Sequence, residues 1–188
     1  MVSSFLHTTL GKPLNNPKIV GKIKKLGQPK FRVEIPLSDD SPDSLPQLAL
    51  DISGDISIKR KGSPIKILIM WPDSSLKKSA TMTFKSLPTS QIEYIDIPSV
   101  AKTDPRILDS AGVVVFLGPE SSTLALMKTV SDAFYPKPVV LFNPKWGFEE
   151  ENNFGDLSAF VGSFEVVYSF MGLEMRGILS KRKGVTFK

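Results

Sequence analysis

The sequence predicts an α/β fold in which helices cover both faces of an open, mostly parallel sheet, giving three layers. Short apolar runs of strand length, such as 112–117, contain almost no polar residue, which is typical of strands covered on both faces. Helical stripes separate these runs, a pattern that indicates strands joined by helical crossovers. The length of 188 residues and the hydrophobic content of 41% favour one globular domain.

The expected elements follow one another in a regular order. FRVEIP at 31–36 alternates as a short strand does. The segment 45–56 fits both helical periodicity and strand alternation, and its length and the Ser44 that precedes Pro46 favour a helix. The remaining elements are a strand at 65–71, a helix at 76–87, a strand at 92–97, a strand at 112–117, a helix at 124–134 and a strand at 138–143.

Two further strands are expected at 164–170 and 175–181. They are close enough in sequence to pair as a C-terminal antiparallel hairpin around Gly172. The sheet is therefore predicted to be Rossmann-like and mostly parallel, with this antiparallel hairpin at its C-terminal end.

The net charge of +5 is concentrated at the start of the chain. Residues 1–30 carry six lysines and no acidic residue, which leaves 18 basic and 19 acidic residues in the rest. We expect a basic leader at 1–30 and a single α/β domain at 31–188. The leader is either a flexible basic tail or, because it contains serine and threonine but no arginine, an incomplete match to an organelle transit peptide. Nucleic acid is not an expected partner, because few aromatic residues lie among the lysines.

The sequence lacks the residues and motifs that several classes of catalytic and binding site require. There is no cysteine, and the single histidine, His7, lies in the leader, which disfavours a catalytic triad or a metal site. Neither a Walker A motif nor a G-x-G-x-x-G motif occurs. No apolar run reaches the roughly 18–20 residues of a membrane span. We therefore predict no catalytic residue, no metal and no cofactor, and we favour a protein that is not an enzyme.

One short motif occurs twice, each time after a predicted strand. WPDSS (71–75) follows the run 65–70, and GPESS (118–122) follows 112–117. Proline, an acidic residue and serines are typical of the start of a helix, which explains both copies without a ligand. The alternative is a binding site, because the carboxyl ends of parallel strands are where ligands bind in such sheets. The candidate binding residues in these copies are Trp71, Asp73, Ser74, Glu120 and Ser121.

A third strand end, NPKWG (143–147), is expected at the same edge of the sheet. It adds Asn143, Pro144 and Trp146 to the candidate binding residues. The two tryptophans, Trp71 and Trp146, have two interpretations: they stand on the rim as anchors for a partner protein, or they cap the core beneath the helices.

The segments FRVEIP, KILIMWPDSS, AGVVVFLGPESS, KPVVLFNPKW and FEVVYSFMGLEMRG resemble, in order and spacing, a domain of unknown function from plants, algae and cyanobacteria. Its members include the chloroplast "low photosystem II accumulation" assembly factor, and the domain also follows the kinase domain of a chloroplast adenylate kinase. The resemblance covers about 31–177. Two departures are the lysine-rich leader in place of a helical lead-in and the end of the chain soon after Arg176.

The resemblance implies a chloroplast protein, in the stroma or at the thylakoid surface, that assists photosystem assembly. It implies no catalytic residue, and Asn143, Pro144 and Trp146 match its most recognisable motif. The first hypothesis is therefore a non-catalytic assembly or stability factor that binds a photosystem subunit or another assembly factor. The alternative is a small-molecule or nucleotide-binding domain with its ligand at the carboxyl edge of the sheet. A third hypothesis is peripheral thylakoid association through the leader and the basic residues at 181–183.

Overall fold

The computed structural model describes residues 27–37, 41, 43–55, 59–60, 63–72, 74–85, 92–100, 102, 105–169, 171–176 and 181–186. Most of the predicted leader and Asp73 therefore lie outside the described residues. The elements are β1 (Lys30–Glu34), α2 (Ser44–Asp55), β2 (Lys59–Arg60), β3 (Ser63–Pro64), β4 (Lys66–Trp71), α3 (Ser74–Lys85), β5 (Ile92–Asp96), α4 (Ile97–Val100), α5 (Arg106–Ser110), β6 (Ala111–Leu117), η1 (Ser121–Thr123), α6 (Leu124–Phe134), β7 (Val139–Phe142), η2 (Phe148–Asn153), η3 (Gly155–Leu157), α7 (Ser158–Val161), β8 (Glu165–Ser169), β9 (Met171–Arg176) and β10 (Lys181–Thr186).

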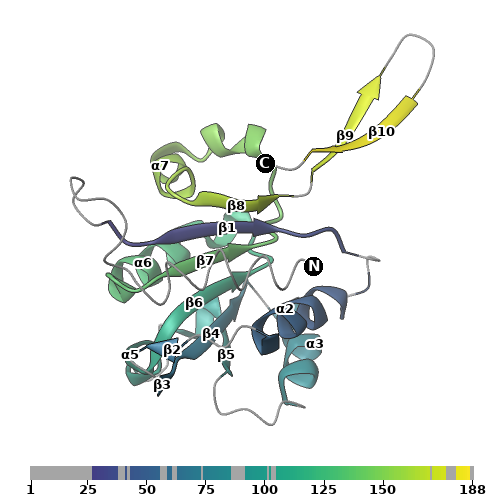
Figure 1. Cartoon of the computed structure of the whole chain (residues 1–188). Coiled ribbons are helices and arrows are strands. Elements are labelled where there is room, and N and C mark those ends of the chain that lie inside the picture. Colours follow the sequence, from purple (N-terminus) through teal and green to yellow (C-terminus); the bar gives the residue numbers. More distant parts are fainter. Residues whose placement is uncertain are drawn as a thin grey trace.

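Six strands form one sheet in the order β5-β4-β6-β7-β1-β8, and each neighbouring pair is parallel (Figure 1). The predicted open α/β class is confirmed. The first strand, β1, lies between β7 and β8, although many residues separate it from both. Parallel pairing requires a long connection between partners, which is why strand neighbours in this sheet come from distant parts of the chain.

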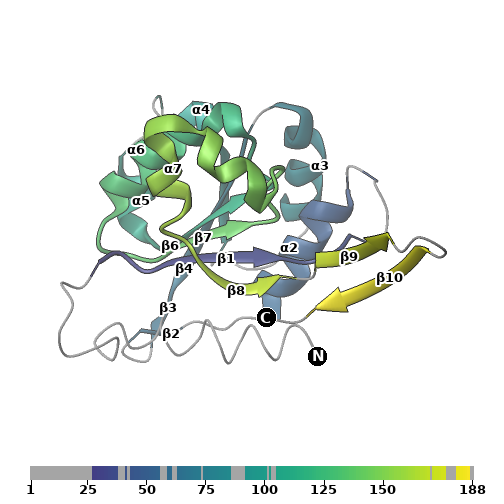
Figure 2. The ribbon, with the colours of Figure 1, turned by 90° about the horizontal axis from the view of Figure 1, so that it is seen from above.

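Helices cover both faces of the sheet, which gives the three expected layers. On one face, apolar residues of α2 and α3 pack on β1, β4, β6 and β7. On the other face, apolar residues of α4, α6 and α7 pack on β4, β6 and β7. Figure 2 shows α4, α5, α6 and α7 together on one side of β1. The stripe predicted for α6 is buried against this second face, because Leu124, Met127, Val130 and Phe134 recur with helical spacing.

The C-terminal strands pair differently from the prediction. Strand β8 joins the six-stranded sheet, in parallel with β1, and does not pair with the segment 175–181. Gly172, the expected turn residue, lies within β9, which is antiparallel to β10. The predicted hairpin of 164–170 with 175–181 is therefore wrong. The physical reason is that β1 offers an unpaired backbone edge beside which β8 completes the sheet.

The contacts of the folded domain include residues that the predicted boundary assigned to the leader. The side-chain amide of Gln28 donates hydrogen bonds to the backbone carbonyls of Ser131 (3.0 Å) and Lys137 (2.9 Å). The carbonyl of Pro29 accepts a hydrogen bond from the Val139 N–H at 2.9 Å. These bonds fix the start of β1 against β7. No helix among the described residues is long and apolar enough to cross a membrane.

Candidate functional site

The carboxyl edge of the sheet contains a point at which the connections diverge. Strands β4 and β6 are neighbours, but β4 is followed by β5 on one side and β6 by β7 on the other. In open α/β sheets, a crevice at such a switch point is the usual place for a ligand. The two copies of the repeated motif lie there, because WPDSS follows β4 and GPESS follows β6.

Leucine side chains fill the space in front of this switch point. Gly118, the first residue after β6, has a left-handed backbone with a φ of 54°. A Cβ atom added to Gly118 would lie 2.5 Å from Leu45 Cδ2 and 3.8 Å from Leu76 Cδ1. Both leucines are buried and come from the helices α2 and α3. In dinucleotide-binding folds, glycine at this place lets a pyrophosphate approach the backbone, whereas here it makes room for Leu45.

Both copies of the motif start a helix, as the first interpretation expects. Helix α3 begins at Ser74, and the 3-10 turn η1 begins at Ser121 and leads into α6. The predicted side-chain caps are not made in the second copy: neither Glu120 nor Thr123 makes a capping hydrogen bond with its side chain. Instead the Thr123 hydroxyl donates to the Glu120 carbonyl at 2.8 Å, and Ser121 is exposed. The motif therefore marks the helix start through its backbone.

Glu120 is engaged by the neighbouring strand end. Its carboxylate lies 2.6 Å from the ammonium group of Lys145, which belongs to the predicted NPKWG segment. The backbone N–H of Lys145 donates to the carbonyl of Pro119 at 2.9 Å. The loops that follow β6 and β7 are thus joined by one ion pair and one backbone bond, and the negative charge of Glu120 is compensated.

Asn143 closes the gap between the ends of β7 and β1. Its backbone is left-handed, with a φ of 46°, which asparagine tolerates better than most residues. Its side-chain oxygen accepts from the Ile35 N–H at 2.7 Å, and its side-chain nitrogen donates to the Ile35 carbonyl at 2.8 Å. Its own N–H donates to the Val33 carbonyl at 2.9 Å. The side chain therefore continues the parallel ladder and is not free to bind a ligand.

Replacing Asn143 with alanine is expected to lower the free energy of unfolding by about 2–4 kcal/mol, because Ile35 loses both partners and alanine is strained at a positive φ. Replacement with glycine removes the same hydrogen bonds without the strain, so it should cost about 1 kcal/mol less. Urea denaturation of both variants measures the difference. Asn153→Ala, at an exposed position of η2, is the control and should change stability by no more than about 0.5 kcal/mol. An Asn143→Ala variant as stable as this control would contradict the structural role.

The two tryptophans are buried. They therefore cap the core and do not stand on the rim as exposed anchors for a partner protein. Trp71 is 2% exposed and stacks with Phe84 and Tyr94 at ring-centroid distances of 6.3 and 5.8 Å. Trp146 is 5% exposed and meets the ring of Phe154 edge-on. Neither indole N–H has a hydrogen-bond partner in the described part of the chain. Pro144 lies next to Trp146 and is half-buried.

The sequence analysis missed a buried charged cluster on β1. Arg32 is 1% exposed, and its guanidinium forms ion pairs with Glu34, at 2.6 Å, and with Glu151. It also stacks over the ring of Phe148, 3.9 Å from the centroid. The remaining oxygen of Glu34 accepts from the Ser169 hydroxyl at 2.7 Å. The cluster ties β1, β8 and η2 together at the carboxyl edge.

Burial lowers the pKa of Arg32 from its ordinary value, and the charge of Glu34 opposes that shift. A signal of this cluster was present in the sequence. The alternation of FRVE places Arg32 and Glu34 on one face of the strand, opposite Phe31 and Val33. Charges on a strand of a sheet with two covered faces require partners, because an unpaired charge is costly to bury.

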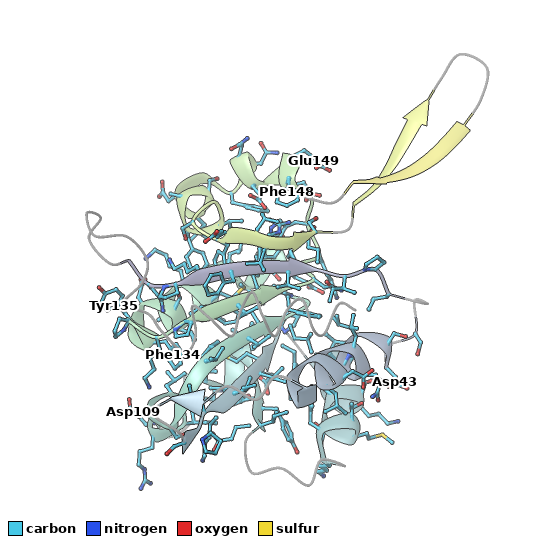
Figure 3. All side chains as sticks on the ribbon, viewed as in Figure 1. Asp43, Asp109, Phe134, Tyr135, Phe148 and Glu149 are labelled. Carbon is cyan, nitrogen blue, oxygen red and sulfur yellow. The ribbon has the colours of Figure 1, made fainter. Side chains whose placement is uncertain are left out.

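Two grooves lie at the carboxyl edge of the sheet, around the segment that follows β1. The first has a volume of about 450 Å³, and the second has a volume of about 400 Å³. The first is lined by Glu34, Ile35, Pro36, Leu37, Asn143, Pro144, Trp146, Gly147, Phe148 and Glu149. The second is lined by Pro36, Leu37, Asp43, Ser44, Gln47, Leu48 and Asp51. Figure 3 shows Phe148, Glu149 and Asp43 toward the carboxyl ends of the strands, away from Asp109 and Tyr135.

The candidate residues thus fall into four groups. Asn143, Pro144 and Trp146 line the first groove together. Trp71 is buried in the core, and Glu120 and Ser121 belong to the loop after β6. Asp73 lies outside the described residues, as does the side chain of Ser74. Within the described ranges, no group of three or more acidic or histidine side chains is arranged to hold a metal ion.

Comparison with known proteins identifies a family. A search of curated proteins and a search of solved structures each found no match. The model of a family described as a domain of unknown function, DUF1995, matches residues 20–188, which begins within the predicted leader and covers most of the chain. The protein therefore belongs to the DUF1995 family.

Proposed function

We propose that this protein is a non-catalytic assembly or stability factor for a photosynthetic complex, and that it acts in the chloroplast by binding another protein. The proposal joins the resemblance to the photosystem II assembly factor with the chemistry of the carboxyl edge. The expected partner is a photosystem subunit or a second assembly factor. The expected location is the stroma or the thylakoid surface.

The observation that carries the proposal is that two of the candidate polar groups at this edge are used within the molecule. The amide of Asn143 is bonded to Ile35, and the carboxylate of Glu120 is paired with Lys145. A general acid or base needs to reach a substrate proton, and these groups face protein atoms instead. What the edge offers to another molecule is a surface of apolar and acidic side chains around the two grooves.

Leu37 gives a direct test of protein binding at this edge. It is 38% exposed and lines both grooves, and Leu126 on α6 is a matched control because it is 40% exposed and lines neither groove. We expect the full chain to capture a photosystem subunit or assembly factor from chloroplast extract. Leu37→Arg should lose that partner, and Leu126→Arg should keep it.

Two results of this capture experiment are decisive in different ways. If the wild-type chain recovers no photosynthetic protein, the assembly function is wrong. If both arginine variants recover the partner as well as the wild type does, the assembly function stands but its surface lies elsewhere. Both substitutions are at exposed positions, and urea denaturation verifies that each variant is folded.

The second candidate function is small-molecule binding at the same edge. One observation favours it: the first groove, at about 450 Å³, falls within the range of about 300–1,000 Å³ that is common for ligand pockets. A thermal-shift screen of nucleotides and metal ions tests this candidate, because a ligand of the native state raises the melting temperature with increasing dose. A dose-dependent rise with a nucleotide, lost in Leu37→Arg, would replace the assembly proposal with this one.

A further inference from the structure

We infer that the two grooves together bind an extended segment of a partner protein in which lysine or arginine side chains alternate with apolar ones. This inference rests on the proposed protein-binding function and specifies the surface and the chemistry of the partner. It depends on the adjacency of the grooves, on their apolar walls and on their charge.

The two grooves adjoin at the segment that follows β1. Pro36 and Leu37 line both of them, so this short stretch of backbone is their shared wall. On one side of it the first groove extends toward η2, and on the other side the second groove extends along α2. A segment that crosses Leu37 would enter both grooves, which favours an extended chain over a compact small molecule.

The walls offer apolar contacts to such a segment. Ile35, Leu37, Pro144 and Phe148 line the first groove, and none of them is fully buried. Leu37 is the most exposed of the four. Covering exposed apolar surface is favourable at roughly 25 cal/mol for each Å² removed from water.

The charge of the grooves selects the partner. Four carboxylates line them, and no lysine, arginine or histidine does: the carboxylates belong to Glu34, Asp43, Asp51 and Glu149. Glu34 is neutralised by Arg32, whereas within the described part of the chain the other three have no ion-pair partner. Within the described residues, the hydrogen bonds to Asp43 and Asp51 come from neutral groups, the hydroxyl of Ser79 and the amide of Gln47, which do not compensate their charges.

Trp146 lies at the first groove with an indole N–H that is unpartnered among the described residues. It lines the first groove, and its indole N–H has no acceptor within the described residues although the side chain is 5% exposed. Buried donors normally have a partner, so an unpartnered one beside a groove is unusual. The nitrogen itself is buried, so a backbone carbonyl of a bound peptide reaches it only if neighbouring side chains move.

The same charges argue against other occupants. Carboxylates repel phosphate groups, which disfavours nucleic acid and an anionic membrane surface at this edge. A cationic segment is attracted, and electrostatic attraction of this kind also raises the association rate. The partner segment is therefore basic and apolar, and it binds more weakly as the salt concentration rises.

A random-peptide library selected on the full chain tests this inference without knowledge of the partner. We expect the selected peptides to be enriched in lysine or arginine separated by aliphatic residues. Their affinity, measured by fluorescence anisotropy, should fall by at least about tenfold in the double variant Asp51→Lys with Glu149→Lys, because like charges then face each other. Asp109→Lys, at the opposite end of the strands in Figure 3, is the matched control and should leave the affinity unchanged.

Several outcomes overturn the inference. These are a failure to select any peptide, a selection without basic residues, and equal binding by the double variant and the wild type. A synthetic peptide of residues 12–26 is a further arm, since this segment carries lysines and no acid. If this peptide displaces the selected peptides and binds with a higher affinity than they do, the occupant is the chain's own leader and not a partner.

Different results would contradict the inference about the grooves and the proposed assembly function. Selection of basic peptides that depend on Asp51 and Glu149, without capture of any photosynthetic protein from chloroplast extract, would uphold the groove and reject the assembly function. Capture of a photosystem subunit by both the wild type and the double variant would uphold the assembly function and reject the groove.

Discussion

Replacing Arg32 with alanine is expected to lower the free energy of unfolding by about 3–5 kcal/mol, because the buried guanidinium is the charge partner of two carboxylates that are themselves mostly buried. Arg32 is 1% exposed, and Glu34 and Glu151 both pair with it. Without it, two negative charges remain close together at the junction of β1 and η2. The ring of Phe148 also loses the planar cation that lies over it.

A second ion pair of this protein provides the comparison. Lys66 and Glu93 lie 2.7 Å apart across β4 and β5, but their side chains are 43% and 30% exposed. Lys66→Ala should therefore cost no more than about 1 kcal/mol. Urea denaturation of both variants under the same conditions measures the contrast. If Arg32→Ala costs no more than Lys66→Ala, the cluster does not hold the edge together.

A triple variant tests whether the loss comes from the unpaired carboxylate charges. Arg32→Met keeps a long apolar side chain, and Glu34→Gln with Glu151→Gln removes both carboxylate charges. We expect the triple variant to be more stable than Arg32→Ala, because replacing a buried ion pair by neutral groups is much less costly than removing one partner. A triple variant as unstable as Arg32→Ala would show that the unpaired carboxylate charges do not dominate the loss.

The succession of strands and helices was predictable, and the strand order was not. The spacing of apolar residues shows whether a segment is a strand or a helix. The sequence therefore placed β4, α3, β6, α6 and β7 within a few residues of their observed bounds. Which strands become neighbours depends on which apolar faces pack together after each crossover connection. An apolar run such as GVVVFL does not indicate which strand will pair with it. For this reason neither the position of β1 between β7 and β8 nor the parallel pairing of β8 was visible in the sequence.

The location of the edge was predictable, whereas the role of its residues was not. Motif position placed Asn143 and Trp146 at a strand end, and both line the first groove. The sequence does not show that the Asn143 side chain hydrogen-bonds to Ile35, which follows β1 and lies more than a hundred positions earlier in the chain. Nor does it show that Glu120 forms an ion pair with Lys145. Arg32 was overlooked because one arginine in a short strand usually lies on an exposed face, and only the covered sheet makes it exceptional.

Trp71→Ala is expected to lower the free energy of unfolding by about 3–5 kcal/mol, since it empties a large volume between α3 and the sheet. The side chain is 2% exposed and packs in a three-ring cluster with Phe84 and Tyr94. Trp71→Phe should lose less than half as much. Phenylalanine keeps one aromatic ring in the stack, and no hydrogen bond is lost because the indole N–H has no partner within the described residues.

Equilibrium denaturation followed by circular dichroism measures both losses without relying on tryptophan fluorescence. Met82→Ala is the control on the same helix, because Met82 is 68% exposed and its truncation should cost no more than about 0.5 kcal/mol. Equal losses for Trp71→Phe and Trp71→Ala would mean that the N–H has a partner after all. A large loss only in Trp71→Ala makes this tryptophan part of the core, so a binding defect in that variant would report unfolding, whereas one in Leu37→Arg would report the surface.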